Sequence, residues 1–131
     1  MLEMALFCPW FVLLFIGALD WGFYAYTMIS VETAARSAAS AIAAQNDVNA
    51  ITSANACNTV IAELSTVPNI GSSVTSCDAA PLVVTASQIT SVDGAAAVQV
   101  SLTYTTPEMI PIPGLLKKQF TITRIVRMRV L

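Results

Sequence analysis

The chain has 131 residues, of which 56% are hydrophobic and only 11% are charged, and its mean hydropathy is +0.71. Ordinary soluble domains carry about 25% charged residues, and the composition excludes an intrinsically disordered chain, which would be polar and rich in charge. Histidine is absent, which removes the commonest general base and the commonest metal ligand.

The first predicted element is an N-terminal helix that inserts into a membrane. The segment Met4–Leu19 has no charge and is crowded with large apolar residues, although it falls short of the roughly 20 residues of a spanning helix. After Asp20, the segment Trp21–Val31 is again uncharged and carries Trp and Tyr residues typical of a membrane–water interface. A cleavable secretory signal fits poorly, because Glu3 stands where such a signal has basic residues. Because this is the only such stretch, a polytopic membrane protein is excluded.

The helix is expected to continue beyond this apolar run. Met28–Gln45 contains no Pro or Gly and is rich in Ala, the best helix former. We therefore expect one helix from about Met4 to Gln45, roughly 63 Å long at about 1.5 Å per residue. Glu32 and Arg36 are four residues apart in the order that favours an ion pair. A stripe of mostly small residues along the outer half favours close helix packing: Ile29, Ala35, Ala38, Ala39 and Ile42.

Three residues are expected to weaken this helix. Pro9 removes a backbone hydrogen bond and clashes with the preceding turn, which predicts a kink. Gly17 and Gly22 have two interpretations that the sequence leaves open. They allow close packing against a neighbour, or they mark a point where the helix stretches or unwinds when it is repacked.

A second, shorter helix and a loop are predicted next. Asp47 is the expected N-cap, apolar residues follow at spacings near three and four, and Pro68 ends the helix. Residues 67–81 are predicted as a loop. Cys57 and Cys77 are expected to form a disulfide in an exported domain, the alternative being two free thiols. No Cys-x-x-Cys pair is present, and we expect no zinc, other metal or cofactor.

The remaining third is predicted to form strands. Leu82–Val92 is rich in β-branched residues, and Asp93-Gly94 is a strong hairpin signal. Apolar residues then alternate with polar ones from Ala96 to Tyr104 and again from Phe120 to Val130. Arg124 falls on the apolar face of the last strand, where it needs a carboxylate or carbonyl partner.

These elements predict an α+β fold in two parts. Residues 1–45 form the long hydrophobic helix, and residues 46–131 form a globular domain. The domain contains the second helix and a three-stranded antiparallel β-meander. The meander is expected to pack against the C-terminal half of the long helix, because its alternating strands have one buried face.

The charges are unevenly distributed along the chain. Residues 1–116 hold one base and eight acids, a net charge of −7, whereas residues 117–131 hold five bases and no acid. This basic segment is either a solvated strand edge that discourages aggregation or a contact surface for nucleic acid, an anionic surface polymer or acidic neighbours. The residues considered for such contact are Lys117, Lys118, Arg127 and Arg129.

The two ends of the sequence resemble TadE-like pilins, the type IV pilin-like proteins of the tight-adherence system. The segments Glu3–Pro9 and Leu13–Gly22 look like the family's opening, a glutamate, a proline step and an apolar run that ends in Gly-x-x-Asp-aromatic-Gly. Thr33–Ala39 is similar to the family's Ala-Ala-Arg segment. The tail, with its Thr-Tyr strand, Pro-x-Pro-Gly-Leu loop and closing Met-Arg-Val, also resembles the family more loosely.

The resemblance implies a structural subunit of a surface filament. Such subunits are cut by a prepilin peptidase, held in the bacterial inner membrane by the helix, and then packed helix to helix with identical subunits by the Tad machinery to support adhesion. Since no basic leader precedes Met1, we expect a processed or shortened chain.

The resemblance also gives a role to Glu3, the glutamate that pairs with a neighbouring subunit's N-terminal amine. A carboxylate in an apolar bundle is costly unless it is paired. The alternative is a frayed, solvated helix start. The residues expected to act in assembly are therefore Glu3, Pro9, Gly17, Asp20 and Gly22.

Two other classes of protein compete with the filament subunit. One is a single-pass, membrane-anchored accessory subunit of a pilus or secretion machine that never polymerises. The other is an anchored enzyme, but the sequence has no paired acids in a motif, no Gly-rich phosphate loop and no nucleophile elbow. We therefore expect no enzymatic activity and no specific nucleic-acid partner.

Overall fold

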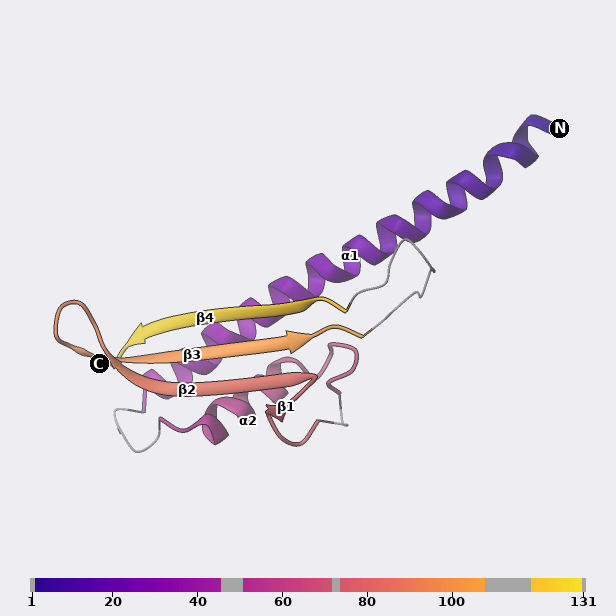
Figure 1. Cartoon of the computed structure of the whole chain (residues 1–131). Coiled ribbons are helices and arrows are strands. Elements are labelled where there is room, and N and C mark those ends of the chain that lie inside the picture. The colour runs from indigo at the N-terminus through magenta and orange to yellow at the C-terminus, as the bar shows by residue number, and fades with distance from the viewer. Residues whose placement is uncertain (1, 46–50, 72–73, 108–118, 131) are drawn as a thin grey trace.

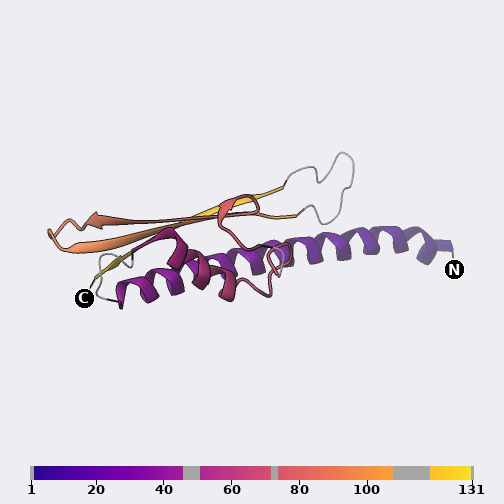
Figure 2. The same cartoon turned by 90° about the horizontal axis from the view of Figure 1, so that it is seen from below.

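The computed structural model describes residues 2–45, 51–71, 74–107 and 119–130 and has an α+β fold (Figure 1). One layer contains the helices α1 (Leu2–Ala43) and α2 (Ser53–Glu63). The other is an antiparallel sheet in the order β1-β2-β3-β4. Figure 2 shows the sheet edge-on with both helices on one side. The strands are β1 (Asp78–Ala79), β2 (Leu82–Thr90), β3 (Ala96–Thr105) and β4 (Thr121–Arg129). The predicted fold class is confirmed, with four strands instead of three.

The helix α1 is continuous for 42 residues and includes Pro9. Its C-terminal half lies under β3 and β4 and beside α2, whereas its N-terminal half extends beyond the sheet (Figure 1). Burial of apolar side chains on α1 begins at Val31. The predicted stripe is buried from Ala35 to Ile42, but Ile29 is 68% exposed. Helical periodicity identifies a face but not where along the helix a neighbouring domain begins, which explains the difference at Ile29.

The helix α2 begins later than predicted. Its N-cap is Thr52, whose backbone is extended and whose side-chain hydroxyl accepts a hydrogen bond from the backbone N–H of Asn55 at 3.3 Å. The prediction that Asp47 caps this helix is therefore wrong, and Asp47 itself lies outside the described residues. Both residues are good caps, and the sequence signal did not separate them. The helix also ends at Glu63, before Pro68.

The strand β1 is the one that the sequence prediction missed. Asp78 pairs with Val83, and Ala79 pairs with Leu82, across the turn at Ala80-Pro81. Two residues are too few to show the alternation that identifies a strand, so the sequence alone predicts only a loop over residues 67–81. Its pairing places Cys77 directly before the sheet edge.

The hairpin between β2 and β3 is confirmed at Asp93-Gly94. The Ser91 N–H donates to the Ala95 carbonyl at 2.8 Å, and the Gly94 N–H donates to the Ser91 carbonyl at 2.9 Å. Gly94 has φ +78°, a conformation that favours glycine. The strand β2 ends at Thr90, two residues before the predicted end.

The core lies between the helix layer and the inner face of the sheet. Val98, Val100, Leu102 and Tyr104 of β3 are all buried, as the alternation predicts. At the hairpin end the pattern differs, because Ala97 is buried and Ala96 is exposed. Four alanines on α1 have no exposed surface, which allows its backbone to approach the other elements closely: Ala34, Ala35, Ala38 and Ala39.

Candidate functional site

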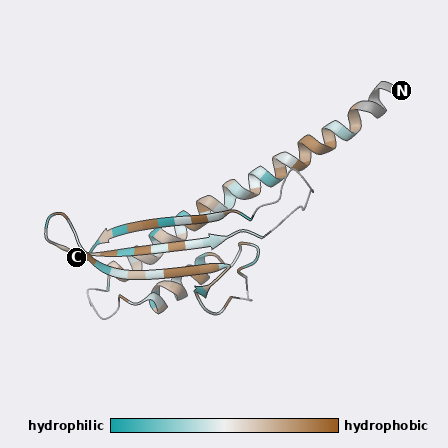
Figure 3. Ribbon diagram, viewed as in Figure 1, coloured by the Kyte–Doolittle hydropathy of each residue, from teal (hydrophilic) through white to brown (hydrophobic). Residues whose placement is uncertain are grey.

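The N-terminal half of α1 presents a large apolar surface to its surroundings. Phe11 is 69% exposed and Trp21 is 77% exposed. Between Phe7 and Ala43, α1 is long and apolar enough to cross a membrane by its length and composition. Figure 3 shows hydrophobic residues along the part of α1 that extends past the sheet. Full burial of one large apolar side chain stabilises by about 1.5–3 kcal/mol. The exposed apolar surface of α1 includes Phe7, Trp10, Phe11, Val12, Leu13, Leu14, Phe15 and Leu19.

The sequence-predicted assembly residues all lie on this half of α1. Glu3 is in the first turn of the helix, and its side chain lies outside the described part. Pro9 is exposed within the helix. A Cβ atom added at Gly17 or Gly22 would meet nothing within 4 Å beyond the nearby helix backbone. Close packing at either glycine therefore requires a neighbour beyond the described residues, and both interpretations of the two glycines stay predictions.

Asp20 interrupts the exposed apolar surface of α1, which resumes at Trp21. Only 8% of the surface of Asp20 is exposed. One turn later, the Tyr24 ring packs edge-on against Phe120 at a centroid distance of 4.8 Å. The Tyr26 hydroxyl lies 3.3 Å from the Thr66 hydroxyl, so a hydrogen bond links α1 to the segment after α2. The aromatic cluster predicted for a membrane interface therefore also joins α1 to the globular domain.

The cysteines predicted to pair are bonded in the structure. Cys57 on α2 and Cys77 before β1 form a disulfide with a Cα–Cα distance of 5.8 Å across a sequence separation of 20. Both are buried. Cys8 is a free cysteine and is exposed on α1. The disulfide joins α2 to the β1 edge of the sheet, which is the part of the sheet farthest along the strand order from β4.

The basic residues of β4 have two different environments. Arg127 and Arg129 are exposed, and the Arg127 Nε donates a hydrogen bond to the Gln99 side-chain oxygen at 2.8 Å. Lys117 and Lys118 lie outside the described residues. Arg124 is half-buried, and its Nε is buried with no hydrogen-bond acceptor in the described parts of the chain. The partner that the sequence analysis required for Arg124 is not supplied there.

Several contacts that position α1 have no sequence signal. The Ser37 hydroxyl on α1 donates to the Glu63 carboxylate of α2 at 3.0 Å. Phe120 was expected on the buried face of its strand, but it is 52% exposed and contacts Tyr24 instead. Ser37 and Glu63 lie 26 residues apart along the chain, and Tyr24 and Phe120 lie about 96 apart. Local sequence patterns do not reach over such separations, so only the folded structure identifies these two contacts. Within the described ranges, no group of three or more metal-ligating side chains comes together.

Comparison with known families gives a match at the N-terminus. The family model described as TadE-like protein matches residues 1–40. The N-terminal segment is TadE-like. No curated protein and no solved structure matches the chain.

The described part of the TadE-like segment, residues 2–40, lies within α1. It includes the exposed apolar surface, the predicted assembly residues and most of the buried alanine stripe, and it ends before α2, the disulfide and the sheet. The match confirms the resemblance inferred from the opening of the sequence. Together with the apolar helix, it indicates a membrane-anchored protein related to the Tad pilus.

Proposed function

We propose that this protein is a non-enzymatic structural subunit of a Tad-type surface filament that supports adhesion. Its N-terminal helix holds it in the bacterial inner membrane before assembly and then packs against the helices of identical subunits. The observation that carries the proposal is the shape of α1. One half is built into the domain core, and the other half extends beyond it with its large apolar side chains exposed.

Water is a poor environment for the exposed half of α1. A monomer in water would leave a row of large apolar side chains uncovered, and exposed patches of this extent mark membrane or protein contacts. Lipid covers such a surface before assembly, and sister helices can cover the same surface in a fibre. The open space around Gly17 and Gly22 is compatible with a close neighbour in either setting.

In this proposal, Glu3 sets how the α1 helices of neighbouring subunits align along their length. It lies in the first turn of α1, immediately before the apolar run. In the TadE-like family the corresponding glutamate is thought to pair with the N-terminal amine of a neighbouring subunit. Since an unpaired carboxylate in an apolar bundle is costly, only the helix register that supplies the cation is stable.

The test compares Glu3→Gln with Asp93→Asn in cells that carry the pilus machinery. Asp93 is exposed at the β2–β3 hairpin, so its substitution removes one carboxylate without touching α1. Sheared surface material is inspected by electron microscopy and mass spectrometry, and the membrane fraction is blotted. We expect Asp93→Asn to form normal fibres that contain this protein. Glu3→Gln should still be inserted in the membrane, but its fibre yield should fall at least about tenfold, because the variant loses a charge-assisted contact.

Cys8 provides a second measurement without any substitution. It is exposed on α1, so a maleimide should label it in detergent-solubilised subunits and should fail to label it in sheared, lipid-free fibres. Wild-type protein found only in the membrane fraction would instead favour the accessory subunit that never polymerises. Normal fibres from Glu3→Gln would remove the role given to Glu3 while leaving the filament proposal in place.

A further inference from the structure

A shallow groove runs between α1 and the beginning of β4. Its volume is about 390 Å³, and its walls come from α1 between Trp21 and Met28, from Phe120 and from β4 between Thr121 and Arg124. The α1 wall contributes Trp21, Tyr24, Ala25 and Met28, so most of the lining is apolar. The groove lies on the side of the domain from which the exposed half of α1 extends.

A second hollow of about 480 Å³ continues along the same edge of the sheet. It is lined by Glu32 and Arg36 of α1 and by β4 from Arg124 to Met128. Residues 25, 28, 32 and 36 are spaced by three or four and lie on one face of the helix. β4 is the last strand of the sheet, so both hollows follow its outer edge. Arg124 lines both and stands where the apolar part meets the polar part.

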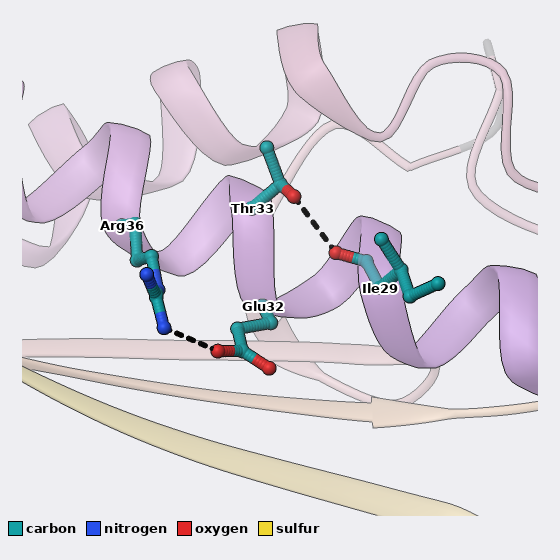
Figure 4. Close-up of polar contacts among 4 residues, drawn as sticks. All are labelled: Ile29, Glu32, Thr33 and Arg36. Carbon is teal, nitrogen blue, oxygen red and sulfur yellow. Dashed lines mark hydrogen bonds and ion pairs between the residues drawn. The ribbon is translucent and has the colours of Figure 1, made fainter.

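The charges around Arg124 are not balanced. Glu32 accepts a hydrogen bond from the Arg36 guanidinium at 2.6 Å, and both side chains lie on the side of α1 that faces the strands (Figure 4). Three guanidinium groups, those of Arg36, Arg124 and Arg127, therefore line this hollow together with one carboxylate. The buried Nε of Arg124 has no acceptor among the described residues. Because the half-buried Arg124 side chain lines both hollows, an anion in the groove would pair with its guanidinium.

The position of the groove along α1 indicates that the anion is a lipid headgroup, because the groove opens near the expected membrane surface. The uncharged apolar run ends at Leu19, before Asp20, and the Trp21–Tyr24 turn lies about 3–8 Å farther along the helix at about 1.5 Å per residue. The headgroup layer on each side of a bilayer is roughly 5–8 Å thick. With residues up to Leu19 in the hydrocarbon, the Trp21–Tyr24 end of the groove opens at the headgroups. Arg124 lies farther from the hydrocarbon, where the groove meets the second hollow between Met28 and Glu32.

The geometry points to a binding site for one phosphoglycerolipid molecule. The lipid phosphate binds the Arg124 guanidinium, and an acyl chain follows the groove past Tyr24 and Trp21 toward the membrane. This site fixes the height and the rotation of the globular domain on the membrane surface. The inference requires only that α1 is inserted in a membrane, and it holds equally for a polymerising and a non-polymerising subunit.

The test measures retained lipid on the full chain. The protein is reconstituted in vesicles of dioleoyl-phosphatidylglycerol and dioleoyl-phosphatidylcholine at equal amounts, extracted into a mild non-ionic detergent and analysed by native mass spectrometry. We expect wild type to retain one phospholipid, enriched in the anionic species. Arg124→Gln should lower the retained fraction about tenfold, which corresponds to about 1.4 kcal/mol.

Two further variants separate the site from bulk charge. Arg129→Gln removes the same charge from an exposed position on the same strand, and it should retain lipid as wild type does. Ala25→Trp fills the groove from an exposed helix position without a change of charge and should displace the lipid. Equal losses in Arg124→Gln and Arg129→Gln would overturn the site. The site would also be overturned if wild type retained no lipid, or if the molecule that wild type retains and Arg124→Gln loses were a second copy of the chain.

Discussion

The hydroxyl of Tyr104 offers a sharp test of how the domain is held together. Tyr104 lies on the inner face of β3 with no exposed surface, and its hydroxyl donates a hydrogen bond to the Pro68 carbonyl at 2.8 Å. This contact joins the sheet to the turns that follow α2. The substitution Tyr104→Phe keeps the buried ring and removes only the hydroxyl, so its effect reports this one hydrogen bond.

We expect Tyr104→Phe to lower the free energy of unfolding by about 1–2 kcal/mol, because the variant loses the bond and leaves the carbonyl without its donor. For a domain of this size, the melting temperature would fall by about 4–16 °C. The matched control is Tyr26→Phe, whose hydroxyl lies 3.3 Å from that of Thr66 in an exposed contact. That variant should change stability by less than about 0.5 kcal/mol.

The assay is thermal unfolding of the full chain in a non-ionic detergent, followed by near-ultraviolet circular dichroism. This signal reports the packing of aromatic side chains, so a micelle-bound helix α1 does not mask loss of the domain. If both variants melted at the same temperature as wild type, the Tyr104 hydroxyl would contribute nothing, and the reasoning from its burial would be refuted.

Two further predictions concern the stability of the same domain. Replacing both Cys57 and Cys77 with Ser should lower the free energy of unfolding by about 3 kcal/mol, because the disulfide closes a loop of 20 residues. Cys8→Ser should leave it unchanged, and two reactive thiols beyond Cys8 in unreduced native protein would contradict the pairing. Burial also raises the pKa of Tyr104 above its usual value of 10.0. The unfolded chain therefore loses this proton at a lower pH than the folded chain. The contribution of Tyr104 to stability should be constant below pH 10 and fall above it by up to about 1.4 kcal/mol per pH unit. A pH titration of the melting temperature should therefore show a steeper fall above pH 10 in wild type than in Tyr104→Phe.

Local patterns in the sequence predicted most of the fold. An uncharged apolar run followed by alanine-rich sequence identified α1, and Asp93-Gly94 identified the hairpin. Alternation identified β3 because that strand is buried on one face only. Each of these signals lies within one continuous segment of the chain, and periodicity and turn chemistry act within such segments.

The missed features depend on contacts between distant segments or on signals too short to read. β1 has two residues and no periodicity, and the choice of Thr52 over Asp47 as a cap could not be read from two suitable residues. The exposed apolar half of α1 was predicted from composition. The groove beside it was not, because it arises where residues near 25 meet residues near 122. The sequence placed Arg124 on an apolar face, but only the fold shows which surface surrounds it.

The two halves of α1 satisfy opposite packing requirements, and their compositions differ accordingly. From Val31 to Ala43 the buried positions are mostly alanine, which lets the backbone lie close to α2 and the sheet. From Phe7 to Leu19 most side chains are large, apolar and exposed, so they gain free energy only from an external apolar partner. The boundary falls at Asp20–Tyr26, where aromatic contacts attach the domain to the helix. A partner that pulls on the exposed half therefore moves the whole domain, because the same continuous helix forms part of its core.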